Sequence, residues 1–187
     1  MTKARMRGRQ TTITFVYMRT GARDMLERAE AAREGQVYAL VASLIFSAFT
    51  LEAYFNHLGR LLHTDWEAVE RGLPKLKKYT TFAKEAKVAY DLGARPYRTM
   101  VALFAFRDRM AHGRTTTEDI DAVIDIDAPR LPQLGADAEW QAFATVDNAK
   151  IAIADVEHLI KELHAASGQS GNPFASAGGG LYGVAGA

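Results

Sequence analysis

The sequence predicts an all-α fold, a compact helical bundle of about four to five helices with an acidic loop or short β element before the last helix. Three observations indicate this class. Apolar residues recur at helical spacing in several separate segments. Residues 37–51 form one long, mostly apolar run, which is typical of a helix buried on most sides. The 187 residues, 48% of them hydrophobic, suit a single domain with a sizeable core.

The N-terminal part of the chain is predicted to be an arm followed by a helix. Residues 1–16 are basic and are expected to be flexible, with a short extended piece at 11–16. The helical domain is expected over residues 17–166. Its first helix covers residues 19–34, where a thin apolar stripe lies on one face, and Gly35 supplies the stop.

The middle of the chain predicts three more helical segments and a turn. The helix over residues 36–63 is the longest and most apolar, so it should be the centre of the fold. A short turn follows at 66–70. The third helix spans 74–90, and the fourth runs from Pro96, a residue favoured in a first helical turn, to His112.

In the last third of the chain, the apolar residues at 115–137 do not follow helical spacing, whereas those after about residue 145 do. Residues 115–137 mix isoleucine and valine with aspartate and glutamate, which predicts an acidic loop or a short strand. This loop is either solvated or docked by basic residues of a partner. The last helix is expected to start near Thr145 or Asp147. Residues 167–187 are rich in Gly, Ala and Ser, which predicts a flexible tail.

Composition excludes several kinds of site. The 23 basic and 22 acidic side chains give a net charge of +1, so any contact with nucleic acid must come from a local patch. There is no cysteine, which excludes disulfides, thiolate nucleophiles and cysteine-ligated zinc. Four of the five histidines do not form a recognisable set of metal ligands: His57, His63, His158 and His164. Neither a metal nor a cofactor is expected.

The apolar run at 37–51 raises the question of a membrane. Its fifteen residues fall short of the roughly 20 that cross a bilayer, and serine and threonine interrupt it. The N-terminus is too polar for a secretory signal. We therefore expect a cytoplasmic protein without a membrane partner, and a membrane-associated helical protein is the hypothesis that rests on this run alone.

The strongest candidate site is Arg107 followed by His112, an R-x4-H spacing. With 15 Arg and 5 His in 187 residues, one fixed spacing occurs by chance about 0.4 times, so the context must carry the argument. The pair ends an apolar helix, where a guanidinium and an imidazole need a partner or a cleft. Asp108 and His112 lie about 40° apart on the helix surface, so the Asp108 carboxylate is expected to orient the imidazole.

These residue types suit metal-independent cleavage of RNA. An imidazole can remove the proton of a ribose 2′-hydroxyl or protonate the leaving 5′-oxygen. An arginine can stabilise the charge that grows on the phosphorane oxygens. Two copies of His112, one from each subunit of a symmetric dimer, would serve both sides of the phosphate. The alternative is an ordinary helix end with solvated side chains.

Two segments of the chain resemble the HEPN family. The run from Ser43 to Gly59, SLIFSAFTLEAYFNHLG, resembles the long central helix of HEPN proteins. Residues 106–113, FRDRMAHG, resemble their R-x4–6-H signature. The resemblance covers about residues 20–165, including a closing helix with Trp140 upstream.

The resemblance implies a helical bundle that is usually a homodimer with the signature at the interface, and often a ribonuclease. Many members are toxins of toxin–antitoxin systems or antiphage proteins, which implies RNA as substrate and an antitoxin or other regulatory protein as partner. The family's functional arginine and histidine fall on Arg107 and His112. Asp108 stands where the family frequently has Asn. Some members lack activity, so a non-catalytic module that binds a protein or nucleotide is the alternative.

Further polar residues are expected to support substrate binding. Glu52 and Asn56 form an i,i+4 pair on the central helix, either as support near the cleft or as a polar exit from the buried stretch. Arg109 is the second basic residue of the signature segment. The lysines between Lys75 and Lys87 form either a solvated face or a contact with the RNA backbone, as does the N-terminal arm.

Overall fold

The computed structural model describes residues 4–113 and 139–185, and six single positions between them (115, 117, 119, 121, 123 and 124). These residues are mostly helical, with one two-stranded sheet, so the predicted mainly α class is confirmed. In chain order the elements are β1 (Arg5–Thr12), α1 (Thr14–Ala31), α2 (Gln36–Leu62), α3 (Trp66–Val69), the 3-10 turn η1 (Glu70–Gly72), α4 (Lys75–Glu85), α5 (Tyr97–Ala111), α6 (Glu139–Phe143), α7 (Val146–Ala166) and β2 (Gly178–Ala185).

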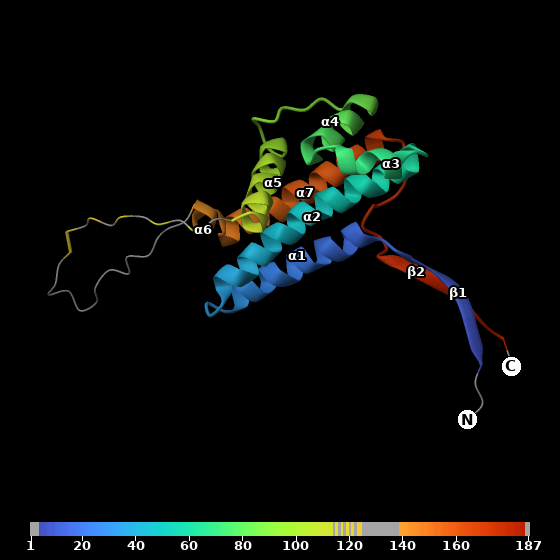
Figure 1. Ribbon diagram of the computed structural model, residues 1–187, viewed down its shortest axis with the longest axis horizontal. Helices are drawn as coiled ribbons and strands as arrows, with labels where there is room; N and C mark the ends of the chain where they lie inside the picture. The colour runs from blue at the N-terminus through green and yellow to red at the C-terminus, as the bar shows by residue number, and fades with distance from the viewer. Residues whose placement is uncertain are drawn as a thin grey trace.

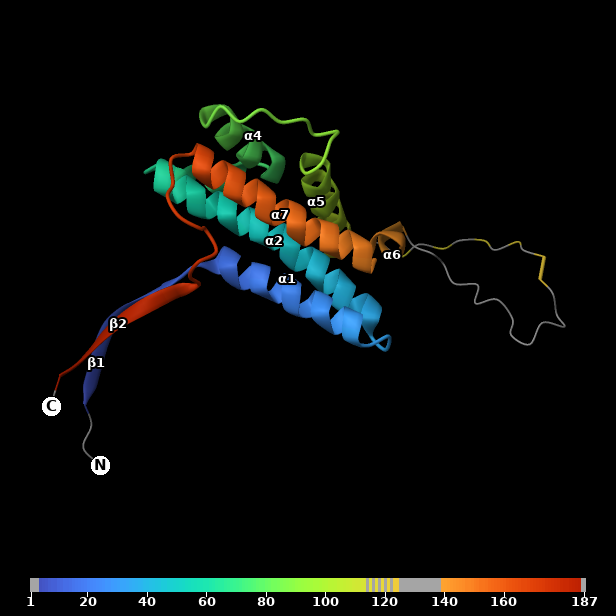
Figure 2. The same ribbon diagram turned by 180° about the vertical axis from the view of Figure 1, so that it is seen from behind.

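Helix α2 lies at the centre of the helical body, as its apolar sequence predicts. Helices α1 and α7 pack along it, and α5 packs against both α2 and α7 (Figures 1 and 2). The largest fully buried side chains come from α2, α4, α5 and α7 and meet in one core: Leu44, Leu51, Tyr54, Phe55, Leu58, Tyr79, Phe82, Met100, Leu103, Leu159, Ile160 and Leu163. Among the described helices, α2 alone is long and apolar enough to cross a membrane, and here it packs against α1, α5 and α7 and also contacts α3 and α4.

Small and hydroxyl residues let α1 approach α2 closely. The Ser43 hydroxyl donates a hydrogen bond of 2.8 Å to the carbonyl oxygen of Ala22, directly between the two helices. A side-chain atom added at Gly21 would lie 3.3 Å from the Phe46 ring, so the glycine permits this spacing. Ser47 donates to the carbonyl oxygen four residues earlier in α2, which satisfies a hydroxyl inside the core.

Helix α7 begins as the sequence predicts. The Thr145 hydroxyl accepts a hydrogen bond of 3.2 Å from the backbone N–H of Asn148, which caps the first turn. Further along α7, the buried Asp155 carboxylate accepts two hydrogen bonds from Arg95, of 2.8 and 2.9 Å, and one from Thr99. These bonds fix the start of α5 to α7.

The two ends of the chain, which were predicted as a flexible arm and a flexible tail, contain one strand each. Residues Arg5–Thr12 and Gly178–Ala185 pair as an antiparallel two-stranded ribbon, which projects from the helical body (Figures 1 and 2). Helix α1 then starts at Thr14 rather than at residue 19. Phe15 and Val16 are buried in the core, so tertiary burial makes a helix of a segment whose β-branched residues favour an extended conformation.

Other boundaries also differ from the prediction. Helix α4 ends at Glu85 instead of residue 90. Two residues after this end, Lys87 has a positive φ of 58°. Helix α6 was not predicted. Most of the predicted acidic loop or strand at 115–137 lies outside the described residues.

A close approach between α2 and the next turn gives a stability prediction. A Cβ at Gly59 would overlap the indole of Trp66, which is itself buried. Gly59→Ala should therefore lower the free energy of unfolding by about 1–3 kcal/mol, since Trp66 must move. Urea unfolding followed by tryptophan fluorescence measures the change. Gly72→Ala is the matched control, because nothing lies within 4 Å of the added atom there; equal destabilisation by both variants would contradict the argument.

Candidate functional site

Helices α2 and α5 bring Glu52 and Arg107 together, although they are far apart in the sequence. The Arg107 Nε atom lies 3.4 Å from Oε1 of Glu52, and both side chains are about a quarter exposed, at 26% and 25%. The Arg107 guanidinium also lies 5.5 Å from the centre of the Phe49 ring, one turn earlier on α2. The pair is an electrostatic contact, because Glu52 Oε1 receives no hydrogen bond from the described residues.

Asp108 joins helix α4 to the same cluster. Its Oδ1 atom accepts a hydrogen bond of 2.8 Å from Lys75 Nζ and one of 3.0 Å from Nη1 of Arg107. Lys75 is the first residue of α4, directly after Pro74. Three helices therefore contribute two cations and two carboxylates to one partly exposed cluster, which we call the Arg107 cluster: Glu52, Lys75, Arg107 and Asp108.

The two carboxylates of the Arg107 cluster have opposite pKa shifts. Burial raises the pKa of Glu52, and the nearby charges of Arg107 and Lys75 only partly offset this effect. Burial would also raise the pKa of Asp108, but the hydrogen bonds from Lys75 and Arg107 outweigh it and lower that pKa. Asp108 is thus held ionised between two cations, while Glu52 is the carboxylate that gains a proton more readily.

Asn56 and Lys78 extend the Arg107 cluster along α2. Lys78 Nζ donates a hydrogen bond of 2.7 Å to Oδ1 of Asn56, one turn beyond Glu52, and lies 5.7 Å from the centre of the Trp66 ring. Burial lowers the pKa of Lys78, with Glu70 and Glu52 acting in the opposite direction. The predicted i,i+4 pair Glu52 and Asn56 does share one face, and each member binds a cation.

His112 lies at the end of α5 and is exposed. Its backbone N–H donates to the carbonyl oxygen of Asp108, at 2.9 Å. The expected hydrogen bond between the Asp108 carboxylate and the imidazole is not formed within the described residues, because that carboxylate is bound to Lys75 and Arg107. In the single chain, Arg107 is therefore fixed against α2 while the His112 ring remains free of described partners.

Arg109 is not brought to the Arg107 cluster. It points to the other side of α5, where its Nη1 atom lies 2.8 Å from Oε2 of Glu139 in α6. No group of three or more His, Asp or Glu side chains that could hold a metal ion is present in the part of the chain that the structure describes.

Three residues around the Arg107 cluster were not assigned to it from the sequence. Lys75 and Lys78 belong to the lysine series that was expected either to be solvated or to contact the RNA backbone, and Phe49 belongs to the apolar run. Their i,i+3 spacing puts the two lysines on one side of α4, but only the packing of α4 beside α2 and α5 shows which residues they meet.

No protein-family model, no curated protein and no solved structure matches this chain. The function therefore has to be inferred from the chain's own residues.

The raised pKa of Glu52 predicts a pH-dependent stability. The folded chain binds this proton more tightly than the unfolded chain does, so the contribution of Glu52 is present at low pH and is lost as pH rises from the ordinary value of 4.5 through the raised one. The melting temperature of Glu52→Gln relative to that of the parent should thus increase as the pH rises above the ordinary carboxylate value of 4.5. Thermal unfolding followed by circular dichroism measures the difference.

Glu67→Gln is the control for the loss of one negative charge, because that carboxylate is 74% exposed. A melting-temperature difference for Glu52→Gln that shrinks toward neutral pH would contradict the assignment.

Proposed function

We propose that this protein is a metal-independent endoribonuclease of HEPN type, which acts as a cytoplasmic homodimer with Arg107 and His112 of both subunits at the interface. Its biological role in this proposal is that of a toxin or an antiphage-defence component, with an antitoxin or other regulatory protein as partner. The proposal requires a mainly helical body, and helices α1, α2, α5 and α7 do pack together.

One observation carries this proposal. The R-x4-H segment ends α5 with a partly exposed guanidinium at Arg107 that contacts two carboxylates, and with an exposed imidazole at His112 that has no partner among the described residues. An arginine that is fixed by two carboxylates is pre-organised for binding a phosphate, whereas an acid–base group needs access to its substrate. The positive charges of Lys75 and Lys78 beside Arg107 would attract the RNA backbone.

The proposed reaction is transfer of the phosphate to the adjacent 2′-oxygen. One His112 imidazole takes the proton of the 2′-hydroxyl, whose oxygen then attacks phosphorus. The bond between phosphorus and the 5′-oxygen breaks, and His112 of the other subunit donates a proton to that oxygen. The products are a 2′,3′-cyclic phosphate and a 5′-hydroxyl. Arg107 stabilises the negative charge on the non-bridging oxygens in the transition state.

The second candidate is a non-catalytic module of the same family that binds a protein or a nucleotide. The observation that favours it is the neutralisation of Arg107 by Glu52 and Asp108, with Lys75 also bound to Asp108. Two carboxylates beside the guanidinium compete with a phosphate for the same positive charge. Activity on RNA separates the two candidates.

The first test is RNA cleavage by His112→Ala. Loss of the acid–base group should lower the cleavage rate by roughly 10²- to 10⁴-fold. The matched control is His158→Ala, which removes another exposed imidazole, from α7, and should keep the parent rate. Gel analysis of a labelled RNA measures both, and a chelator should leave the rate unchanged.

Equal cleavage by His112→Ala and the parent would disprove the assignment of His112. No cleavage of any RNA by the purified parent, freed from any neutralising partner, would favour the non-catalytic module.

The second test concerns the charge of Asp108. Asp108→Asn keeps an acceptor for Lys75 but removes the carboxylate that competes with the RNA phosphate, so KM for RNA should fall roughly three- to ten-fold. Asp24→Asn, an exposed change on α1, controls for net charge. Steady-state cleavage kinetics measure KM; an unchanged or higher KM in Asp108→Asn alone would show that Asp108 supports the site instead of weakening it.

A further inference from the structure

The terminal ribbon of β1 and β2 separates its side chains by chemistry. The register pairs Arg7 with Gly183 and Arg9 with Leu181, so Arg5, Arg7 and Arg9 all lie on one face. Alternate residues of a strand are about 7 Å apart along the backbone, so the three arginines form one row on this face. All three side chains are exposed, and none forms an ion pair with a described residue.

Side chains on the opposite face of the ribbon stabilise the register in which β1 and β2 pair. The Tyr182 ring crosses Gly8 on the neighbouring strand and lies over Gly180 on its own, and its hydroxyl donates a hydrogen bond of 2.6 Å to Gln10. A Cβ at Gly180 would lie 2.6 Å from this ring, so glycine is needed there. An aromatic ring over cross-strand glycine fixes which side chains share a face, and here it fixes the row of Arg5, Arg7 and Arg9.

The charge of the chain is unevenly distributed. Without these three arginines, the remaining 20 basic side chains face 22 acidic ones, a net charge of −2 instead of +1. The strands Arg5–Thr12 and Gly178–Ala185 contain no Asp or Glu. The ribbon is thus a concentrated positive surface, whereas the rest of the sequence sums to a small negative charge.

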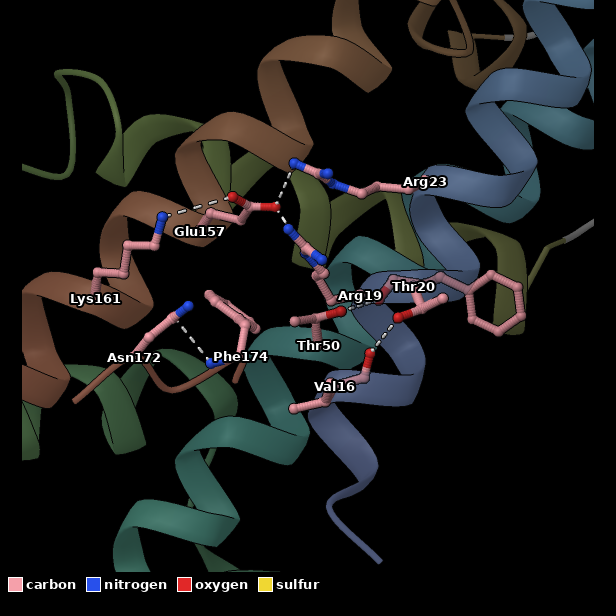
Figure 3. A network of polar contacts seen from close by, with 10 residues as sticks. Val16, Arg19, Thr20, Arg23, Thr50, Glu157, Lys161, Asn172 and Phe174 are labelled. Carbon is pink, nitrogen blue, oxygen red and sulfur yellow. Dashed lines mark hydrogen bonds and ion pairs between the residues drawn. The ribbon is translucent and has the colours of Figure 1, made fainter. Parts of the chain in front are cut away.

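The root of the ribbon is anchored to the helical body. Figure 3 shows Arg19 and Arg23 of α1 both directed at Glu157 of α7, at 2.7 and 3.0 Å, with Phe174 nearby. The Arg19 guanidinium lies 5.3 Å from the centre of the Phe174 ring, which also packs on Phe15. The segment that leads into β2 is thereby held against the start of α1, so the ribbon leaves the body from a fixed point.

A hollow lies beside this root, on the C-terminal half of α2. It has a volume of about 310 Å³ and lies between the end of β1 and α2, and its lining includes Thr12, Phe15, Asn56, His57 and Arg60. Asn56 is also the residue that binds Lys78, and it stands one turn from Glu52. A single strand that enters the hollow from the ribbon would therefore meet the face of α2 that carries Asn56 and, one turn earlier, Glu52.

We propose that Arg5, Arg7 and Arg9 of the ribbon bind the phosphate backbone of a single-stranded RNA whose adjoining nucleotides cross the hollow toward Arg107. This inference rests on the proposed function for the choice of RNA as the polyanion. Guanidinium groups bind phosphates through paired hydrogen bonds, and neutralising phosphates releases counterions. The row thus supplies the local basic patch that the near-zero net charge of the chain requires.

Two other occupants fit the ribbon less well. A second ribbon paired along β1 would place like charges on neighbouring strands, which is destabilising. A lipid surface would favour one apolar face, whereas the exposed side chains of Met6 and Leu181 lie on opposite faces. The charge row favours a polyanion on the face of Arg5, Arg7 and Arg9.

The experiment measures binding without cleavage. Fluorescence anisotropy of a labelled 2′-O-methyl oligouridine of about 16 nucleotides gives Kd for the full chain, since this RNA has no 2′-hydroxyl to react. Replacing Arg5, Arg7 and Arg9 together by Gln should raise Kd at least roughly ten-fold and reduce the slope of log Kd against log salt by about 2. The matched control replaces Arg28, Arg33 and Arg98, three exposed arginines away from the ribbon, and should keep the parent Kd.

A second pair of variants tests the ribbon without a change of charge. Tyr182→Ala uncovers the two glycines and should weaken RNA binding, whereas Tyr182→Phe keeps the ring and should bind within about two-fold of the parent. An unchanged melting temperature in all variants shows that the helical body is intact.

The outcomes separate this inference from the proposed function. RNA binding that depends on the ribbon arginines supports the inference even if no RNA is ever cleaved. Cleavage by the parent together with equal binding by the ribbon variant overturns the inference and leaves the nuclease proposal standing. Absence of RNA binding by the parent overturns the inference as well. In that case the same arginines could still bind vesicles that contain phosphatidylserine, or mediate self-association measured by sedimentation, and either result would assign the ribbon another partner.

Discussion

The apolar surface of α2 is the constraint on which the rest of the structure depends. Its buried residues, from Leu40 to Gly59, form a band that covers about half of its circumference at 100° per residue, which is too wide for one neighbouring helix to cover. Helices α1, α5 and α7 all pack on it, and the short helices α3 and α4 close its C-terminal end. These contacts remove the apolar band of α2 from water, which stabilises the fold, and they determine where the other helices lie.

The candidate site lies where this covering ends. Glu52 marks the point at which the surface of α2 turns polar, and α5 leaves the core at Arg107. Charged groups at such a boundary must be paired, because a lone charge there would lose its hydration. Asp108 and Lys75 complete the pairing across three helices. These ion pairs lower the cost of placing charges at the edge of the core. They also reduce the positive charge with which Arg107 and Lys75 can bind a phosphate.

The sequence predicted the elements better than their contacts. The bounds of α2 and the Thr145 cap follow from local patterns, namely a long apolar run and a hydroxyl before a helical stripe. The R-x4-H spacing and the Glu52–Asn56 pair could likewise be found by counting along one helix. The pairing of Arg107 with Glu52, and of Lys75 with Asp108, joins residues more than thirty positions apart. No pattern within one helix encodes such a contact, because it depends on how separate helices pack.

The sequence by itself determined a mainly helical chain with a central apolar helix and a basic, arginine-bearing N-terminus. Only the tertiary structure decided that this N-terminus pairs with the glycine-rich C-terminus, since a single strand has no hydrogen-bond partner of its own. It also decided that Asp108 binds Lys75 and Arg107 rather than the His112 ring. The physical reason is the same in both cases. Local propensity fixes the elements, whereas hydrogen bonds and ion pairs between distant segments depend on which surfaces the burial of α2 brings together.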